Sequence, residues 1–156
     1  MQQQKKRNAA RKIFPRLSPP AARLLRSARV AHLATADASG KPHVIPICFA
    51  VAGRELYTPL DAKPKRVAAL SLKRVRNIIA NPEVAVVVDT YDEDWRRLAY
   101  VLLHGRARIV TRGKLHDKAV RLLKIKYMQY RKMPLLYHPV VVIRWDRATV
   151  WSAISA

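Results

Sequence analysis

Apolar and polar residues alternate along three short stretches in the first half of the chain. Side chains alternate within Arg29–Asp37, and a second run extends from Pro42 to Val51 after the polar turn Asp37-Ala38-Ser39-Gly40. A period of two is typical of β-strands, and a short turn containing glycine is typical of a hairpin. Gly53 marks another tight turn, after which Glu55–Thr58 returns as a third strand. The pattern predicts an antiparallel meander.

Pro46 lies inside the second of these runs. Proline cannot donate a hydrogen bond to a neighbouring strand, so it is confined to sheet edges, bulges and strand ends. We therefore expect an edge, a bulge or an open ladder at this position. An open ladder would leave backbone groups free for a ligand.

Apolar residues recur with the period of a helix along three further stretches. The first begins at Ser18, a hydroxyl residue suited to an N-cap and followed directly by two prolines. The second extends over Lys65–Ala80, where Asn81-Pro82 stops it, and the third extends over Lys114–Tyr130. The chain is predicted to contain three helices, the first of them short.

Four more strands complete the prediction. The β-branched run Glu83–Asp89 forms one, and Arg96–Val110 forms a long strand that Gly105 allows to bend. Val140–Trp145 and Ala148–Ile154 form the last two. Antiparallel strands interspersed with a few helices predict an α+β protein built on a small antiparallel barrel of about six or seven strands.

Composition predicts one domain preceded by a tail. The chain has 156 residues, enough for a single self-sufficient core. Residues 1–16 are Gln-rich and basic with little to bury, so we expect a disordered tail there and the domain at 17–156. The single cysteine, Cys48, cannot form an intramolecular disulfide. No apolar run reaches the roughly 20 residues that span a bilayer, and we expect a cytoplasmic protein without membrane contact.

The formal net charge is +21 and the isoelectric point is about 11.1. Such a charge predicts salt-sensitive, non-specific binding to polyanions. The cations are spread along the whole chain, and no zinc-ligand set, stacking aromatic motif or helix-turn-helix pattern accompanies them. A basic β-barrel module that binds nucleic acid without redox activity is therefore kept as an alternative.

The stretch from Tyr57 to Arg66 carries the main candidate site. It leads from the third strand, ending in Tyr57 and Thr58, into the second predicted helix, and it places Lys63, Lys65 and Arg66 at the join. Backbone N–H groups at a helix start and charged donors beside them bind phosphate. Cations at this end of a helix oppose the helix dipole, which an anion would relieve. The alternative is a solvated first turn.

No catalytic set of side chains emerges from the sequence. The histidines are dispersed without metal-ligand spacing, and no serine lies in a Gly-x-Ser-x-Gly elbow. Asp92 and Asp94 could bind a cation or act as acid and base, but we favour a solvated turn beside Trp95. A Gly-rich dinucleotide fingerprint is also missing. We predict no catalytic side chain and no metal site, so redox chemistry would require a bound cofactor.

Several short segments together resemble the pyridoxamine 5'-phosphate oxidase-like superfamily. They are the hairpin residues Arg29–Thr35 and Gly40–His43, the return strand Glu55–Thr58, the segment Asp61–Arg66 and the helix end Asn77–Pro82. Within that superfamily, Val88–Trp95 and Tyr127–Arg131 are similar to the group of probable coenzyme F420-dependent oxidoreductases. The likeness extends from about Pro20 to the C-terminus.

The resemblance implies a split β-barrel homodimer that holds a flavin or deazaflavin in a groove between subunits. It implies a cofactor phosphate held by Lys63, Lys65 and Arg66, with Tyr57 and Thr58 beside it. It also implies that the ring lies along the strand segment Ile45, Pro46, Ile47 and Cys48, and that Trp95 and Trp151 complete the pocket from the partner subunit.

Two positions differ from the vitamin B6 oxidase itself. Ile45 replaces an arginine, and Ala62-Lys63-Pro64-Lys65 replaces a Ser-Arg-Lys run. These differences argue against vitamin B6 oxidation, and they fit a deazaflavin as well as a loosely held flavin. The resemblance thus implies an oxidoreductase that transfers hydride between F420, the first choice, or FMN and a small organic substrate. A haem-binding relative of the same barrel is a further alternative, which would need an axial histidine.

Overall fold

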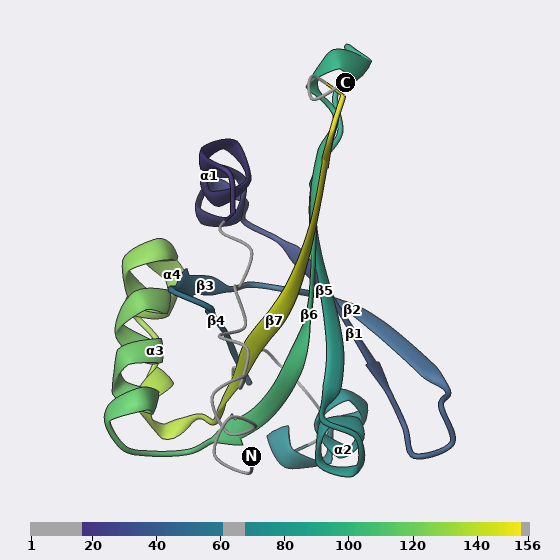
Figure 1. Ribbon diagram of the computed structural model, residues 1–156. Helices are drawn as coiled ribbons and strands as arrows, with labels where there is room; N and C mark the ends of the chain where they lie inside the picture. The colour runs from purple at the N-terminus through teal and green to yellow at the C-terminus, as the bar shows by residue number, and fades with distance from the viewer. Residues whose placement is uncertain (1–16, 61–67, 154–156) are drawn as a thin grey trace, which may run out of the picture.

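The computed structural model describes residues 17–60 and 68–153, arranged as Figure 1 shows. The helices are α1 (Pro19–Ser27), α2 (Lys73–Ala80), α3 (Lys114–Lys126) and α4 (Met128–Arg131), and the 3-10 turns are η1 (Ala69–Ser71), η2 (Trp95–Arg97) and η3 (Leu135–Tyr137). The strands are β1 (Ala31–Ala36), β2 (Pro42–Ile47), β3 (Ala50–Ala52), β4 (Glu55–Pro59), β5 (Glu83–Thr90), β6 (Ala99–Val110) and β7 (Val140–Ser152).

The seven strands form one antiparallel sheet in the order β2-β1-β5-β6-β7-β4-β3. The two edge strands, β2 and β3, are separated in the chain only by Cys48 and Phe49. Consecutive Cα atoms lie 3.8 Å apart, so these edges cannot be more than about 11 Å apart where the chain crosses between them. The sheet must therefore curl until its edges meet, which confirms the predicted α+β split barrel.

Two of the predicted strand boundaries are wrong. The run Pro42–Val51, expected to be one strand, divides at Cys48 and Phe49 because its first part pairs with β1 and its second with β4. Conversely, the two strands expected at the C-terminal end form the single strand β7, in which Asp146 is an extra residue opposite the His104/Gly105 step of β6. A β-bulge accommodates one unpaired residue without ending a strand.

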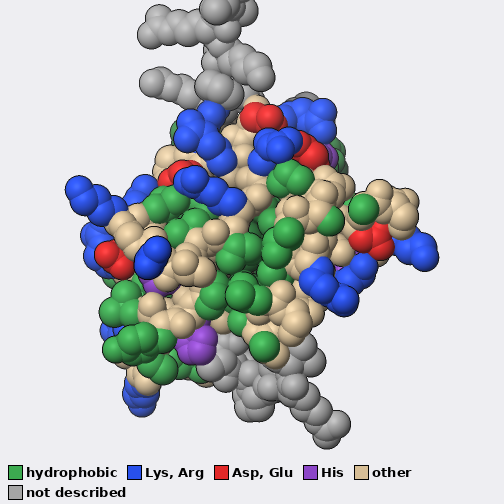
Figure 2. Space-filling view, turned by 90° about the horizontal axis from the view of Figure 1, so that it is seen from below, with side chains coloured by type: hydrophobic (Ala, Val, Ile, Leu, Met, Phe, Trp, Pro, Cys, Tyr) green, Lys and Arg blue, Asp and Glu red, His purple; other side chains and the backbone are tan. Residues whose placement is uncertain are grey.

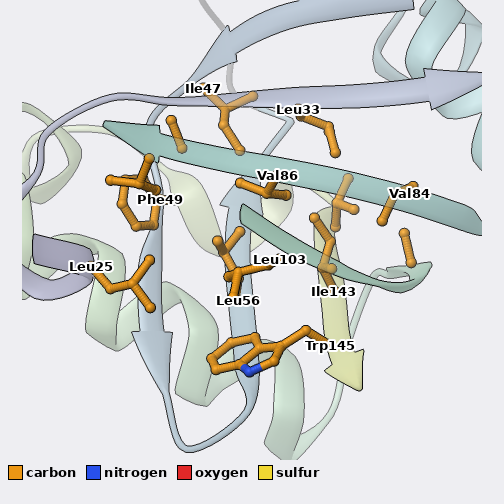
Figure 3. Close-up of a cluster of buried hydrophobic side chains, with 14 of the residues drawn as sticks. Leu25, Leu33, Ile47, Phe49, Leu56, Val84, Val86, Leu103, Ile143 and Trp145 are labelled. Carbon is orange, nitrogen blue, oxygen red and sulfur yellow. The ribbon is translucent and has the colours of Figure 1, made fainter. Parts of the chain in front are cut away.

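Apolar side chains fill the barrel from every side. Residues from α1, the β2–β3 bend and six strands point toward one another in its interior, as Figure 3 shows for Leu25, Leu33, Ile47, Phe49, Leu56, Val84, Val86, Leu103, Ile143 and Trp145. A second buried cluster lies between α3 and the outer face of β3, β4 and β7. The α1 helix begins as predicted, with the Ser18 hydroxyl accepting a hydrogen bond from the Ala21 N–H (3.4 Å).

The helix predicted over Lys114–Tyr130 is interrupted. It ends at Lys126, and Tyr127 adopts an extended conformation before the short helix α4. Tyr127 is buried, and its hydroxyl reaches across to the chain at Phe49. A continuous helix would direct this side chain elsewhere, so the tertiary contact outweighs the helical pattern. Among the described residues, no helix is long and apolar enough to cross a membrane.

Candidate functional site

The strand segment Ile45–Cys48 lies at an edge of the sheet, as Pro46 predicted. Pro46 pairs with His32 of β1 and is exposed, while Ile47 faces the core. Within the described residues, β2 has a strand neighbour on one side only. Val44, 59% exposed, lies on the same face as Pro46. The segment therefore presents an apolar outer face next to an open backbone edge.

The backbone at the bend after β2 has a partner within the chain. The Tyr127 hydroxyl accepts a hydrogen bond from the Phe49 N–H (3.0 Å) and lies 2.7 Å from the Arg29 carbonyl oxygen, to which it donates. Burial raises the pKa of Tyr127, which keeps this hydroxyl protonated as a donor. The N–H group that the broken ladder leaves at Phe49 is thus taken by Tyr127 and is not available to a ligand.

Tyr57 and Thr58 are buried in β4. The Tyr57 ring packs beneath α3, its hydroxyl donates to Glu55 Oε2 (2.7 Å), and Lys118 Nζ lies 5.6 Å from the ring centroid. Burial, chiefly, raises the pKa of Tyr57. Thr58 is only 2% exposed. Within one chain these two side chains face packed protein rather than a groove, and their contact with a cofactor stays a prediction.

The structure does not test the predicted cationic helix start. Lys63, Lys65 and Arg66 lie outside the described residues. The helix expected to begin at Lys65 begins at Lys73, because Ala68 and Leu72 are extended and Ala69–Ser71 forms only a 3-10 turn between them. The prediction of one helix over Lys65–Ala80 is therefore wrong at its start, although its end before Asn81-Pro82 is confirmed.

The first turn of α2 has the properties predicted for an anion site. It contains Lys73, Arg74 and Arg76, it has no acidic residue, and its N-cap residue Leu72 makes no side-chain capping bond. Uncapped N–H groups and the helix dipole both favour an anion at this end of a helix. These three cations lie within the longer helix predicted over Lys65–Ala80 and not at its start, which is why they were not predicted as site residues.

This helix start is fixed against the turn at the beginning of β2. Lys73 Nζ lies 3.1 Å from Asp37 Oδ2, and inside the barrel Asn77 Nδ2 donates to Thr35 Oγ1 (3.0 Å). Asp37 Oδ1 also accepts hydrogen bonds from the Ser39 hydroxyl and the Lys41 N–H. These bonds, the one from Ser39 first, hold the pKa of Asp37 well below its usual range. The cations at the α2 start thus lie beside one end of the exposed strand β2.

Lys and Arg side chains dominate the rim of the molecule. Figure 2 shows them around the edge of one face, with hydrophobic side chains gathered in the middle and few acidic groups between. The net charge of +21 makes this surface attractive to anions in general. The surface charge therefore does not show where an anion would bind. The start of α2 is the candidate position because its cations and helix N–H groups lie together.

Trp95 and Trp151 lie on an extension of the sheet. Figure 1 shows the ends of β5, β6 and β7 projecting beyond the barrel, with η2 at the tip. Trp95 is 70% exposed in η2, and Trp151 stacks on Tyr100 with ring centroids 5.8 Å apart. The tip lies at the opposite end of the molecule from α2 in this view. One chain does not bring Trp95 to the cations of α2, and completion of the pocket by a partner's tryptophans remains a prediction.

A buried amine lies behind the β2–β3 bend, and the sequence pattern did not single it out. Lys126 Nζ lies 3.8 Å from the centroid of the Phe49 ring and has no hydrogen-bond partner in the described part of the chain. Burial, with a smaller contribution from the Arg29 charge, lowers the pKa of Lys126 to about 8. At the end of a helix a lysine usually points into solvent, so only the tertiary structure reveals this environment.

The described residues contain no metal-ligand cluster. No three histidine, cysteine or carboxylate side chains in residues 17–60 and 68–153 come together as metal ligands. Asp94 instead caps η2, accepting a hydrogen bond from the Arg96 N–H, and its carboxylate also pairs with the Arg96 guanidinium. Those contacts, the guanidinium first, lower the pKa of Asp94. Asp92 and Asp94 thus pair with the neighbouring Arg97 and Arg96.

Comparison with solved structures finds the same fold in several proteins. A conserved hypothetical protein from Mycobacterium tuberculosis aligns with a TM-score of 0.70 at 20% identity, covering 90% of this chain and 88% of its own. The haem storage protein HutZ from Vibrio cholerae aligns with a TM-score of 0.68 at 15% identity, covering 88% and 95%. A FAD-binding protein from Mesorhizobium loti aligns with a TM-score of 0.63 at 25% identity, covering 86% and 94%.

Sequence comparison gives the family. No curated protein matches the chain significantly. The family model described as pyridoxamine 5'-phosphate oxidase matches residues 17–152, which include every described element of the barrel. This chain belongs to the pyridoxamine 5'-phosphate oxidase family.

Proposed function

We propose that this protein is an oxidoreductase that binds a flavin-type cofactor and transfers hydride between it and a small organic substrate. Family membership and the similar FAD-binding protein support a flavin. None of the proteins compared above is named for F420, so FMN becomes the first choice and F420 the second. The substrate is expected to differ from vitamin B6, because Ile45 replaces an arginine of that oxidase.

The start of α2 is the observation that carries this proposal. The first turn of this helix contains Lys73, Arg74 and Arg76, no acidic residue and no side-chain cap, and Lys73 also pairs with Asp37. A phosphate placed there would accept hydrogen bonds from the first N–H groups and from charged side chains. The residues present therefore fit the phosphate end of FMN or F420.

The strand β2 offers a matching surface for the rest of the cofactor. Its six residues extend over about 20 Å from the Asp37 turn to the Cys48 bend. The outer face carries Val44 and Pro46, and the backbone edge is open. Apolar side chains would exclude water from one side of a flat ring, and backbone groups could hydrogen-bond its edge. Lys63, Lys65 and Arg66, outside the described residues, remain predicted phosphate ligands.

The chemistry is assigned to the cofactor, with the protein providing position and electrostatics. A bound flavin or deazaflavin accepts or donates hydride at its ring. In this chain, Lys73 and Arg74 would hold the phosphate, β2 would orient the ring, and Val44 and Pro46 would shield it. We assign no side chain as general acid or base.

We further propose that the active form is a homodimer. Trp95 and Tyr91 are 70% and 68% exposed and lie on the extension that projects beyond the barrel in Figure 1. Large exposed aromatic groups are characteristic of protein interfaces. Pairing with a second copy would bury them and bring Trp95 and Trp151 to the groove along the partner's β2. A monomeric mass at micromolar concentration in sedimentation would contradict this assembly.

Titration of the purified protein with FMN and with F420, each followed by its fluorescence, tests the cofactor assignment. We expect saturable quenching of at least one cofactor. Anions bind to basic proteins generally, so a control for charge is needed. The variant Arg121→Ala/Lys124→Ala removes from α3 the same charge that Lys73→Ala/Arg74→Ala removes from α2, and it should bind the cofactor as wild type does. Failure of both cofactors to bind saturably would overturn the proposal.

Haem binding is a second candidate. The similar protein HutZ is a haem storage protein, and this chain has an exposed histidine, His32, opposite Pro46 on the outer face of the sheet. An axial histidine and an apolar face could hold a haem. An absorption spectrum after addition of haemin distinguishes haem binding from flavin binding. A sharp Soret band that His32→Ala removes would support haem, and the absence of such a band would favour the flavin proposal.

A further inference from the structure

One cavity of the described structure lies beside the helix α1. It has a volume of about 440 Å³ and is enclosed between α1 and the strands β6 and β7 where they begin to project from the barrel. This volume falls within the range of small-molecule sites, roughly 300–1,000 Å³. The site proposed for the flavin includes none of its lining residues apart from Trp151.

The floor of this cavity is apolar. Leu24 contributes from α1, and Val101 and Val150 contribute from neighbouring positions of β6 and β7. Val150, near the end of β7, is 44% exposed. Exposed apolar side chains that line an enclosed hollow gain free energy when a ligand displaces water from them. The floor therefore favours an apolar ligand body.

The charges around the cavity are of one sign. Three arginines line it and no acidic residue does; they are Arg23, Arg96 and Arg97. Arg96 and Arg97 are engaged by the carboxylates of Asp94 and Asp92 outside the cavity. Arg23 has no hydrogen bond or ion pair with any residue in the described part of the chain. Its guanidinium is thus free to pair with an anionic ligand, and an arginine binds a carboxylate through two parallel hydrogen bonds.

We propose that this cavity binds a small amphiphile that has an apolar body and a single carboxylate, with Arg23 as the carboxylate ligand. The apolar floor and the unpaired guanidinium are both required, because neither a neutral apolar molecule nor a small anion satisfies the whole site. The cationic lining also disfavours occupation by the basic segment 1–16. This inference is independent of the flavin proposal.

Calorimetric titration with octanoate tests the site, with 1-octanol and acetate as probes that lack the charge and the apolar body respectively. The wild-type protein should bind octanoate saturably at one site per chain, and both other probes at least about tenfold more weakly. Arg23→Gln should reduce octanoate affinity by about tenfold to a hundredfold, the loss of one charged hydrogen-bonded contact, and leave octanol binding unchanged.

Two further variants make the result specific. Arg26→Gln removes the same charge from the same helix but does not line the cavity, so its octanoate affinity should equal that of wild type. Val150→Asp places a carboxylate at the floor and should abolish octanoate binding, while circular dichroism reports that the variant is folded. The proposal is overturned if octanoate does not saturate one site, or if Arg23→Gln and Arg26→Gln lower its affinity equally.

Discussion

Replacing Lys126 by methionine should stabilise the protein. The Lys126 ammonium is buried over the Phe49 ring at 3.8 Å and has no hydrogen-bond partner among the described residues. A buried charge without a hydrogen-bonding partner loses solvation that a single aromatic ring does not replace. Methionine keeps an unbranched apolar side chain of similar length without the charge, so Lys126→Met removes the unfavourable part of this contact.

The size of the effect follows from the pKa of Lys126. Burial lowers this pKa from 10.5 to about 8. At 1.36 kcal/mol per pKa unit, a protonated Lys126 costs the folded state up to about 3.4 kcal/mol. Two effects make the gain in stability smaller than this. Solvent partly reaches Lys126, and the substitution loses a cation–π contact of about 0.5–2 kcal/mol. We expect Lys126→Met to raise the free energy of unfolding by about 1–2 kcal/mol at pH 7.

The sign of the pH dependence is fixed by the lowered pKa. Below pH 8 both the folded and the unfolded chain carry the proton, and the full penalty is present. Between pH 8 and 10.5 the unfolded chain binds more protons at Lys126 than the folded chain does, so wild-type stability rises relative to Lys126→Met. Above pH 10.5 neither state is protonated, and this advantage of the variant disappears.

Urea denaturation followed by circular dichroism at pH 7 and pH 10 measures both quantities. Lys124→Met, two residues earlier on α3, is the matched control and should stay within about 0.5 kcal/mol of wild type. The reasoning is refuted if Lys126→Met destabilises the protein at pH 7, or if the difference between variant and wild type is the same at both pH values.

Three further predictions concern the bend, the bulge and the surface charge. Tyr127→Phe leaves the buried Phe49 N–H without its partner and should cost about 1–3 kcal/mol in urea denaturation, whereas Tyr137→Phe, at an 88% exposed position, should cost nothing measurable. Gly105→Ala should lower the free energy of unfolding by about 1–3 kcal/mol or more, because a Cβ there would collide with the Arg144 carbonyl oxygen and the backbone must shift. Binding to duplex DNA should be weak and vanish near physiological salt; tight binding with a log–log salt slope of about −0.9 per phosphate, retained in Lys73→Ala/Arg74→Ala, would instead favour the nucleic-acid alternative.

The sequence was sufficient to predict the fold class and most of the elements. Alternation and turn residues located β1, β4, β5 and β6, and Pro46 indicated the sheet edge. Where the prediction was wrong, long-range pairing decided the outcome. The pairing of β2 with β1 and of β3 with β4 divides one continuous apolar run, and the pairing of β7 with β6 carries one strand across Asp146. These pairings join residues far apart in the chain, so the local sequence pattern does not indicate them.

A cationic helix start was predictable from the sequence, but its position was not. Lys73, Arg74 and Arg76 lie in the first turn of a helix that begins eight residues after the predicted start at Lys65, and anion binding there stays a prediction. The helical period of Lys65–Ala80 is compatible with a break at Ala68–Leu72, because Ala and Leu occur in helices and in turns. The environment of Lys126 depends on Phe49, distant in sequence, and no local pattern could have indicated it.

The central claim, that the start of α2 binds the phosphate of a flavin, is tested most directly by titrating FMN and riboflavin against wild type and Lys73→Ala/Arg74→Ala. Riboflavin lacks the phosphate, so the pair of ligands isolates that contact. Wild type should bind FMN at least about a hundredfold more tightly than riboflavin, and the double variant should lose most of that difference while its riboflavin affinity stays unchanged. The variant Lys63→Ala/Lys65→Ala, tested in parallel, should also have a lower affinity for FMN. If wild type and the α2 variant discriminate FMN from riboflavin equally, the phosphate is not held at this helix start and the account is contradicted.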